Sequence, residues 1–437
     1  MSERGKNRPS ASALDFDDAV AACGRPSGAT ETRPLAPSPL LSALRRAGTS
    51  HVYADTADTE ELGKLLATAG GAIVAEVDGN TANQPLVRKV VDRYLAAADL
   101  KDCTDDLRRR GDLAKQPLPP LLYAIVCGRI GNDFTRAFAS GRAWEVSLQI
   151  HMSLASDVEA AKRIGRHLRR MVPTAFVKVP FAPYAPQCFF IARDLERQGI
   201  PVNFTSTFSA RQAVVAALLG EVTRTNIFMG RLNQGLEAAL LGEHVDLEAQ
   251  RQLKRLRAET GAKTQLIVAS MRDWQTFMRV AGCDVFTAPC EAIRDFLAQT
   301  EVAPQAIRSQ LETSYEDSLG ISDKVLKALG TERIARLYRV EPELVEFLLE
   351  LRSSAEWSAM RDGERLARRF DEAGFGDFFY VPSTGEWEAM KKNKLPDLEA
   401  PVTKRLALDT LFSLLADADF ENHQAEIDRK IAERLGA

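Results

Sequence analysis

The sequence predicts an α/β protein built as a (β/α)₈ barrel, the TIM barrel, with a disordered N-terminal arm and an extra helical C-terminal segment. Short β-like runs alternate with stretches whose apolar residues recur three and four positions apart, which is the pattern of a parallel sheet with helical crossovers. About eight such runs fall within about 250 residues, which fits a closed barrel better than an open doubly wound sheet. Polar residues follow several of the runs, where a barrel of this kind carries its active site.

The N-terminal segment, residues 1–36, is rich in Ser, Ala, Pro, Gly and charged residues, and we expect it to be a largely disordered arm. A helix is predicted directly after it, with Ser38 as N-cap, Pro39 at the first helical position and Gly48 at its end. We expect the barrel to occupy residues 37–300 and a helical extension, residues 301–437, to pack on it.

The predicted strands are the runs HVYADTA (51–57), AIVAEVDGNTA (72–82), AWEVSLQI (143–150), AFVKVP (175–180), IPVNFTSTF (200–208), TNIFMGRL (225–232), TQLIVAS (264–270) and CDVFTAP (283–289). The connection between the second and third runs, residues 83–142, is long enough for two or more helices.

Composition narrows the possible classes of protein. The chain has 437 residues, 45% of them hydrophobic and 27% charged, with a net charge of −3, so nothing indicates a nucleic-acid partner. No apolar run approaches the roughly 20 residues of a membrane helix, and the basic N-terminus lacks the apolar core of a secretory signal. The six cysteines lack metal-type spacing and the five histidines are dispersed, so we expect a cytoplasmic protein with reduced thiols and no metal site.

Lys178 stands out within the predicted strand FVKVP, because an unpaired buried ammonium is costly. Side chains alternate along a strand, so if Val177 and Val179 face the helices, Lys178 points into the barrel, close to the strand end at Pro180. A desolvated lysine has a lowered pKa, and its neutral amine can attack a carbonyl and form a Schiff base. The pentapeptide alone leaves open a lysine that reaches the barrel mouth or pairs with a carboxylate.

Polar residues at other strand ends support a site there. They are Asp55, Asn80, Thr81, Asn83, Asn203, Thr205, Arg231, Ser270 and Arg272. Each is weak evidence alone, because Asp often caps helices and Ser, Thr and Asn are common in loops. The arginines and the serine suit a phosphate, although ion pairs with helix carboxylates would explain both arginines equally well.

Through these residues the sequence resembles the transaldolases and, more broadly, the transaldolase and fructose-6-phosphate aldolase superfamily of class I aldolases. The resemblance runs from about residue 38 to 297 and is weaker beyond. It is carried by seven segments in the family's order and approximate spacing: YADTAD, VDGNTANQPL, VSLQIHMSLASD, FVKVP, VNFTSTFS, FMGRL and VASMRD.

The resemblance implies catalytic roles for three residues. Lys178 looks like the Schiff-base lysine, and Asp55 looks like the acid/base aspartate at the end of the first strand. Thr205 resembles the threonine that holds the catalytic water. Neither a metal nor an organic cofactor is implied, because the lysine supplies the electron sink.

The resemblance also implies a substrate site for sugar phosphates. Asn83 and Asn203 look like the asparagines that orient the hydroxyls of a dihydroxyacetone unit. Arg231, Ser270 and Arg272 match the family's sugar-phosphate clamp. A homodimer is a possible assembly.

Three residues depart from the transaldolase and aldolase patterns. Gln149 replaces the transaldolase glutamate on the third strand, and a neutral amide can orient water but cannot deprotonate it. The aldolase branch also has glutamine there but compensates with a tyrosine on the sixth strand, where this chain has Phe228, as transaldolases do. Asn226 stands where a serine is usual. Proton transfer would then rest on Asp55 and a water held by Thr205 and Gln149.

Three functions are consistent with these residues. The first is a transaldolase-type transfer of a three-carbon dihydroxyacetone unit between sugar phosphates, with an unusual sugar as one consequence of Gln149. The second is an aldolase that releases or adds free dihydroxyacetone or a related donor. The third is a catalytically weakened sugar-phosphate-binding protein whose terminal extensions contact a partner.

Overall fold

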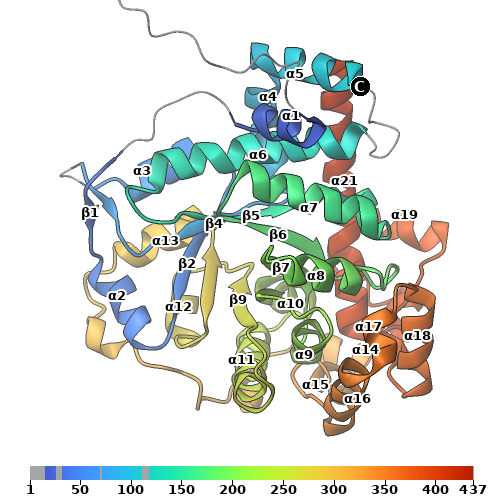
Figure 1. Cartoon of the computed structure of the whole chain (residues 1–437). Coiled ribbons are helices and arrows are strands. Elements are labelled where there is room, and N and C mark those ends of the chain that lie inside the picture. Colours follow the sequence, from blue (N-terminus) through green and yellow to red (C-terminus); the bar gives the residue numbers. More distant parts are fainter. Residues whose placement is uncertain (1–14, 26–31, 69–70, 111–117, 437) are drawn as a thin grey trace, which may run out of the picture.

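The computed structural model describes residues 15–25, 32–68, 71–110 and 118–436. Its centre is a closed barrel of eight parallel strands in the order β10-β2-β4-β5-β6-β7-β8-β9 (Figure 1). The barrel strands are β2 (His51–Asp55), β4 (Gly79–Thr81), β5 (Glu145–Gln149), β6 (Ala175–Pro180), β7 (Val202–Thr207), β8 (Arg224–Phe228), β9 (Gln265–Ala269) and β10 (Val285–Ala288). The barrel prediction is confirmed, since every predicted run overlaps one of these strands.

The second predicted run divides into two strands. Its first part, β3 (Ile73–Val74), pairs with β1 (Leu35–Ala36) in a small separate sheet, and only Gly79–Thr81 enters the barrel. Gly79 suits this entry because a Cβ at its position would lie 2.0 Å from the Glu145 carbonyl oxygen on the neighbouring strand.

Helices surround the barrel and connect its strands: α3 (Thr59–Leu66), α4 (Gln84–Leu95), α5 (Ala98–Arg109), α6 (Leu118–Phe138), α7 (Val158–Met171), α8 (Cys188–Arg197), α9 (Ala210–Leu218), α10 (Met229–Gly235), α11 (Leu241–Thr260), α12 (Gln275–Arg279) and α13 (Cys290–Leu297). Three of them, α4, α5 and α6, fill the long connection after β4, as its length predicts.

The N-terminal segment contains a helix that the sequence interpretation missed. Helix α1 (Phe16–Cys23) is capped by the Asp15 side chain, which accepts a hydrogen bond from Asp18 N, and it packs against α7 and α5. Its apolar residues are few and lie between Ser-, Pro- and Gly-rich stretches, so tertiary packing rather than a long periodic pattern stabilises it. Residues 1–14 and 26–31 of the expected disordered arm lie outside the described residues, and its end contains the short strand Leu35–Ala36.

Helix α2 (Pro39–Arg46) follows the sequence prediction. Ser38 is its N-cap and accepts from Leu41 N at 3.4 Å, and Pro39 is its first residue. Ala47 ends the helix and Gly48 follows at φ 116°, a conformation that favours glycine.

The predicted helical extension contains α14 (Asp323–Leu329), α15 (Thr331–Ala335), α16 (Pro342–Ser353), α17 (Ala355–Ala359), α18 (Gly363–Glu372), α19 (Thr384–Lys392), α20 (Pro401–Arg405) and α21 (Leu408–Leu435). Helix α21 has 28 residues and runs along much of the height of the molecule in Figure 1, in contact with α4, α6 and β7. Tail residues such as Trp357, Phe412 and Phe420 belong to the same apolar core as the barrel.

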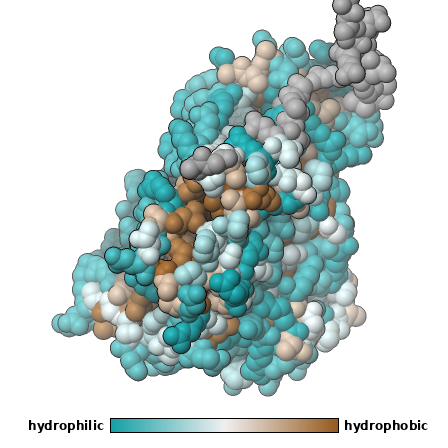
Figure 2. Space-filling view, turned by 90° about the vertical axis from the view of Figure 1, so that its left-hand side faces the viewer, coloured by the Kyte–Doolittle hydropathy of each residue, from teal (hydrophilic) through white to brown (hydrophobic). Residues whose placement is uncertain are grey.

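The face that carries β1 and α2 is mostly hydrophilic, with an apolar strip beside the atoms drawn in grey (Figure 2). Leu35 of β1 is one of two large apolar side chains that are exposed in the described part of the chain. No helix among the described residues is both long and apolar enough to span a membrane.

Candidate active site

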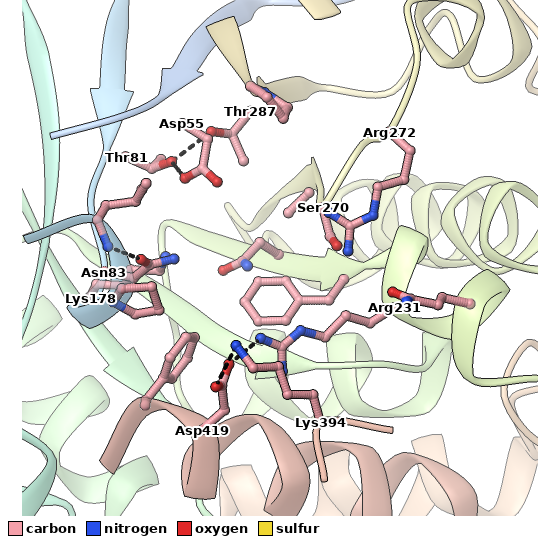
Figure 3. A pocket seen from close by; sticks show the side chains of 18 of the residues that line it. Asp55, Thr81, Asn83, Lys178, Arg231, Ser270, Arg272, Thr287, Lys394 and Asp419 are labelled. Atoms are coloured by element: carbon pink, nitrogen blue, oxygen red, sulfur yellow. Dashed lines mark hydrogen bonds and ion pairs between the residues drawn. The ribbon is translucent and has the colours of Figure 1, made fainter. Parts of the chain in front are cut away.

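A cavity of about 540 Å³ opens at the carboxyl ends of the barrel strands (Figure 3). It is lined from the barrel by Asp55, Thr81, Asn83, Pro85, Leu86, Lys178, Asn203, Asn226, Phe228, Arg231, Gln234, Ala269, Ser270, Arg272, Thr287 and Pro289, and from the tail by Lys392, Asn393, Lys394, Leu395, Asp419 and Phe420. The parallel strands end at one rim, and this shared rim brings the barrel residues together although they are far apart in the sequence.

Lys178 reaches this cavity from β6 while its side chain stays almost fully buried, at 3% exposure. Val177 and Val179 are fully buried on the opposite face of the strand, as alternation predicts. Within the described residues, the Lys178 ammonium has neither a hydrogen bond nor an ion pair. Burial lowers the pKa of Lys178 to about 8, and the negative charge of Asp55 opposes that shift. The structure therefore does not support the interpretation of a carboxylate-paired lysine.

Asp55 belongs to a short hydrogen-bonded row across β2, β4 and β10. Thr81 Oγ1 donates to Asp55 Oδ1 at 2.7 Å, and the hydroxyls of Thr81 and Thr287 lie 2.6 Å apart. This row fixes one carboxylate oxygen at the cavity wall. Thr287 was not singled out in the sequence, because a threonine in a strand is ordinary.

Strand pairing places three amide and amine groups at one level. Gln149 of β5 is the register partner of Lys178 in β6, and Lys178 is the partner of Asn203 in β7. Gln149 Nε2 contacts Met152 Sδ at 3.5 Å, and Asn203 Nδ2 lies 3.3 Å from Ser147 Oγ. The register therefore places Gln149 and Asn203 on the two strands that flank Lys178.

Several buried polar atoms around Lys178 have no hydrogen-bond partner among the described residues. They are Gln149 Oε1, Asn203 Oδ1, Thr205 Oγ1 and Asn226 Oδ1. Buried polar atoms of proteins are nearly always hydrogen-bonded, so four such atoms together mark a place for water or ligand. Thr205 and Gln149 lie behind the wall of the cavity rather than on it, since neither is among the lining residues.

The two asparagines of the second strand end have different roles in the structure. Asn83 lines the cavity and is also the N-cap of α4, where its Oδ1 accepts from Leu86 N at 3.1 Å. Its amide nitrogen is therefore free to donate a hydrogen bond to a ligand in the cavity. Asn80 is structural: it donates to the Thr56 carbonyl and accepts from Trp144 Nε1, both at 3.0 Å.

Arg231, Ser270 and Arg272 come together at the end of the cavity away from Asp55 (Figure 3). Ser270 has φ 64°, a strained conformation for a non-glycine residue. Gly230 allows the close approach, because a Cβ there would lie 2.0 Å from the Ser270 carbonyl oxygen and 3.2 Å from Arg272. Burial, and next the positive charge of Arg231, lower the pKa of Arg272. Two guanidinium groups that line the same end of a cavity are suited to bind an anion.

The two arginines differ in their partners. Arg231 Nη2 donates to Asp419 Oδ2 at 2.7 Å, so the ion-pair interpretation applies to this arginine, whereas Nη1 is buried without a partner in the described structure. The Arg231 guanidinium also lies over the rings of Phe228 and Phe420, 5.8 and 5.9 Å from their centroids. Arg272 has no hydrogen bond or ion pair to any described residue.

The tail residues of the cavity were not found by sequence reasoning. Asp419 and Phe420 come from α21, and Lys392–Leu395 come from the end of α19 and the segment after it. Their spacing along α19 and α21 is ordinary for charged helices, so it carried no signal for a site.

Helix α21 also holds the end of β7. Ser206, which follows Thr205, has φ 62°, and its hydroxyl donates to Asp417 Oδ1 at 2.8 Å. Its carbonyl oxygen accepts from Ser413 Oγ at 2.7 Å. Burial raises the pKa of Asp417 well above its usual range, because the ionised carboxylate is desolvated there.

The fold and the site together define a class: a (β/α)₈ barrel whose cavity holds a buried lysine, unpaired among the described residues, and two arginines at its other end. The family model for transaldolase/fructose-6-phosphate aldolase matches residues 52–336.

Among curated proteins, a probable transaldolase of Rhodospirillum centenum is 34% identical over 211 residues, 47% of this chain and 83% of the relative. A probable transaldolase of Hyphomonas neptunium is 26% identical over 249 residues, 56% of this chain and 88% of the relative. The chain belongs to the transaldolase/fructose-6-phosphate aldolase family.

Proposed function

We propose that this protein transfers a three-carbon dihydroxyacetone unit between sugar phosphates through a Schiff base at Lys178. The observation that carries the proposal is the environment of Lys178: its amine is buried, faces the cavity and has a pKa of about 8. At neutral pH an appreciable fraction of such an amine is uncharged and nucleophilic. An ordinary exposed lysine would be almost entirely protonated.

In the first half-reaction the Lys178 amine attacks the C2 carbonyl of a ketose phosphate, and one water leaves as the imine forms. The protonated imine draws in the electrons of the C3–C4 bond while the Asp55 carboxylate accepts the proton of the C4 hydroxyl. The bond breaks, an aldose phosphate departs, and the three-carbon unit stays on the lysine as an enamine.

In the second half-reaction the enamine carbon forms a bond with the carbonyl carbon of an acceptor aldehyde. Asp55 returns its proton to the new hydroxyl, and water hydrolyses the imine to release the product ketose and free Lys178. Thr81, which donates to Asp55, orients the carboxylate for both proton transfers. Arg231, Ser270 and Arg272 hold the phosphate at the other end of the cavity.

Hydrolysis and imine formation require a positioned water, and Gln149 and Thr205 are assigned to hold it. Both have buried oxygens without partners in the described part of the structure. Because the Gln149 amide cannot accept the proton of that water, Asp55 is the base for these steps as well. This assignment predicts that the imine forms and hydrolyses more slowly than in an enzyme with a carboxylate at position 149.

Gln149 also favours a second function, an aldolase that releases free dihydroxyacetone. A turnover assay with fructose 6-phosphate, run with and without erythrose 4-phosphate as acceptor, separates the two. Turnover only with acceptor supports transfer, whereas equal release of free dihydroxyacetone without it supports the aldolase. A protein that binds the ketose phosphate in calorimetry but turns over none of a broad substrate panel would instead be a weakened, binding-only member of the family.

The Schiff base is tested by reduction with borohydride in the presence of fructose 6-phosphate, followed by peptide mass spectrometry. We expect a stable adduct on the peptide that contains Lys178. Lys178→Arg, which keeps the positive charge but cannot form the imine under these conditions, is the matched control and should give no adduct. Absence of an adduct in the native protein would overturn the proposed function.

A further inference from the structure

The cavity contains a negative charge at its cation-rich end. Asp419 of α21 lies there with its side chain 5% exposed, and both of its oxygens contact cationic groups (Figure 3). Oδ2 accepts from Arg231 Nη2 at 2.7 Å, and Oδ1 lies 2.9 Å from Lys394 Nζ and 3.5 Å from His423 Nε2.

This carboxylate is ionised at neutral pH. Burial acts to raise the pKa of Asp419, but the positive charges of Arg231 and Lys394 outweigh burial and hold the pKa below its usual value. Asp419 therefore presents a permanent anion to the groups that a substrate phosphate would use.

Arg231 has donors for a second anion. Its Nη1 is buried without a partner in the described residues, and the neighbouring Arg272 carries no ion pair there. Lys394 is 62% exposed, lines the same cavity and can turn toward a ligand, because its stem is flexible. A phosphate entering between these three cations has to share or take over the contacts that Asp419 makes.

We propose that Asp419 is a built-in competitor for the substrate phosphate, and that Lys394 is a third cation of the phosphate subsite. This inference rests on the proposed function in assigning the phosphate of the sugar to this end of the cavity. A phosphate dianion is attracted to the three cations more strongly than a single carboxylate charge is, so it displaces Asp419 from part of its contacts. A monoanionic sugar acid or an uncharged sugar lacks that advantage, and Asp419 thereby selects for phosphorylated substrates.

Both residues lie outside the part of the chain that matches the family model, residues 52–336. The tail thus adds a charged pair to a subsite whose other members lie on the barrel. The same two segments of the tail contain a matched pair: Lys391 Nζ lies 2.9 Å from Glu421 Oε1, and neither residue lines the cavity.

The test is calorimetric titration of the full chain with inorganic phosphate at fixed ionic strength. We expect Asp419→Asn to tighten phosphate binding about tenfold, because a charge within reach of the ligand is removed. Lys394→Met should weaken binding several-fold. Lys391→Met and Glu421→Gln, the matched controls from the neighbouring pair, should each stay within about twofold of the native protein.

If Asp419 served only to orient Arg231, Asp419→Asn would weaken phosphate binding instead of tightening it. Weakened or unchanged binding in this variant overturns the proposal. If Asp419→Asn does not fold, Lys394→Met decides, and binding equal to that of Lys391→Met overturns the proposal.

Selectivity is measured with the same variants. We expect Asp419→Asn to raise affinity for gluconate, a monoanionic sugar acid, relative to the native protein. These titrations need no turnover, so they remain informative if borohydride traps no adduct at Lys178. An adduct at Lys178 together with unchanged phosphate affinity in Asp419→Asn would overturn this inference and leave the proposed function standing.

Discussion

At the scale of single residues, the structure explains why a lysine can lie buried in the barrel at position 178. Its ammonium is desolvated by the barrel, and the nearest opposing influence is the charge of Asp55 rather than a direct ion pair. A protein gains no stability from such a group. Its presence is instead consistent with chemistry that needs a neutral amine, because strongly perturbed titrating groups in cavities are frequent at active sites.

The first prediction concerns the pH dependence of adduct formation. Because the pKa of Lys178 is lowered to about 8, the neutral fraction of its amine rises with pH and reaches one half near pH 8. The rate of borohydride-trapped adduct formation from fructose 6-phosphate should therefore rise between pH 6 and pH 8 and level off above about pH 9. A rate that keeps rising toward pH 10.5 would indicate an unperturbed lysine.

The second prediction concerns stability. The folded-state pKa of about 8 lies below the ordinary value of 10.5, so burying Lys178 costs about 3 kcal/mol below pH 8, at about 1.4 kcal/mol per pH unit. Lys178→Met should raise the free energy of unfolding by about that amount at pH 7. Between pH 8 and 10.5 the unfolded chain binds the extra proton, so native stability rises with pH and the difference from the variant shrinks. Urea unfolding at pH 7 and pH 10 measures this.

At the scale of elements, the start of α10 packs directly against the segment that carries Ser270 and Arg272. Gly230 lies against the end of β9, where Ser270 adopts φ 64°. The sequence showed the arginines but not this contact, because a glycine in FMGRL is compatible with many local structures.

The third prediction follows from that contact. Gly230→Ala should push Ser270 and Arg272 away and raise KM for a phosphorylated ketose at least about tenfold, since the added Cβ meets backbone that cannot move without shifting β9. Binding of inorganic phosphate should weaken in parallel. Gly385→Ala, at a glycine with nothing within 4 Å of the added atom, is the control.

Helix α21 acts as a second element of the site through its contacts with β7. Ser413 and Asp417, one turn apart on the helix, hold Ser206 by its carbonyl and its hydroxyl. The residue before it, Thr205, is thereby kept in place without a hydrogen bond of its own side chain to any described residue.

The fourth prediction concerns Asp417. Because burial raises its folded-state pKa well above the ordinary value of 3.8, the native protein binds more protons than the unfolded chain above about pH 4. The free energy of unfolding therefore falls as pH rises from about 4 toward the folded pKa. Asp417→Asn, which mimics the neutral form, should lose this pH dependence and be more stable than the native protein at pH 8. Equal pH profiles for the two proteins would contradict the raised pKa.

At the scale of the whole molecule, barrel and tail share one apolar core. Phe412 of α21 stacks on Phe208 with ring centroids 5.2 Å apart, and Phe420 contacts Phe228 at 6.2 Å. Buried polar links add to this, since Arg211 of α9 donates to both oxygens of Asp409 at 2.7 and 2.8 Å. Removing the helix would expose both apolar surface and a buried guanidinium.

The fifth prediction follows from this shared core. A chain that ends at residue 407, and so lacks α21, should fail to fold cooperatively, as judged by the thermal transition in circular dichroism. A cooperative transition within a few degrees of the full chain would show instead that the barrel is independent of the tail.

The alternation of strands and helices, the helix capped by Ser38 and the position of Lys178 inside the barrel were all predictable from the sequence. These features depend on local patterns and on the geometry common to all parallel barrels, which brings the strand ends to one rim. Helix α1, the side sheet of β1 and β3 and the partners of the arginines were not predictable. Arg231 and Asp419, for example, lie 188 residues apart, and no periodicity links them.

The sequence by itself therefore determined the architecture of this protein and the identity of its buried amine. Only the tertiary structure decided how the cavity around that amine is built. Thr81 hydrogen-bonds the Asp55 carboxylate and is itself bonded to Thr287, Arg231 at the far end is already paired with Asp419 of the tail, and α21 hydrogen-bonds Ser206, the residue after Thr205. The physical reason is that burial, pKa and ion pairing depend on the groups packed around a side chain, and in this chain many of those groups come from its last 50 or so residues.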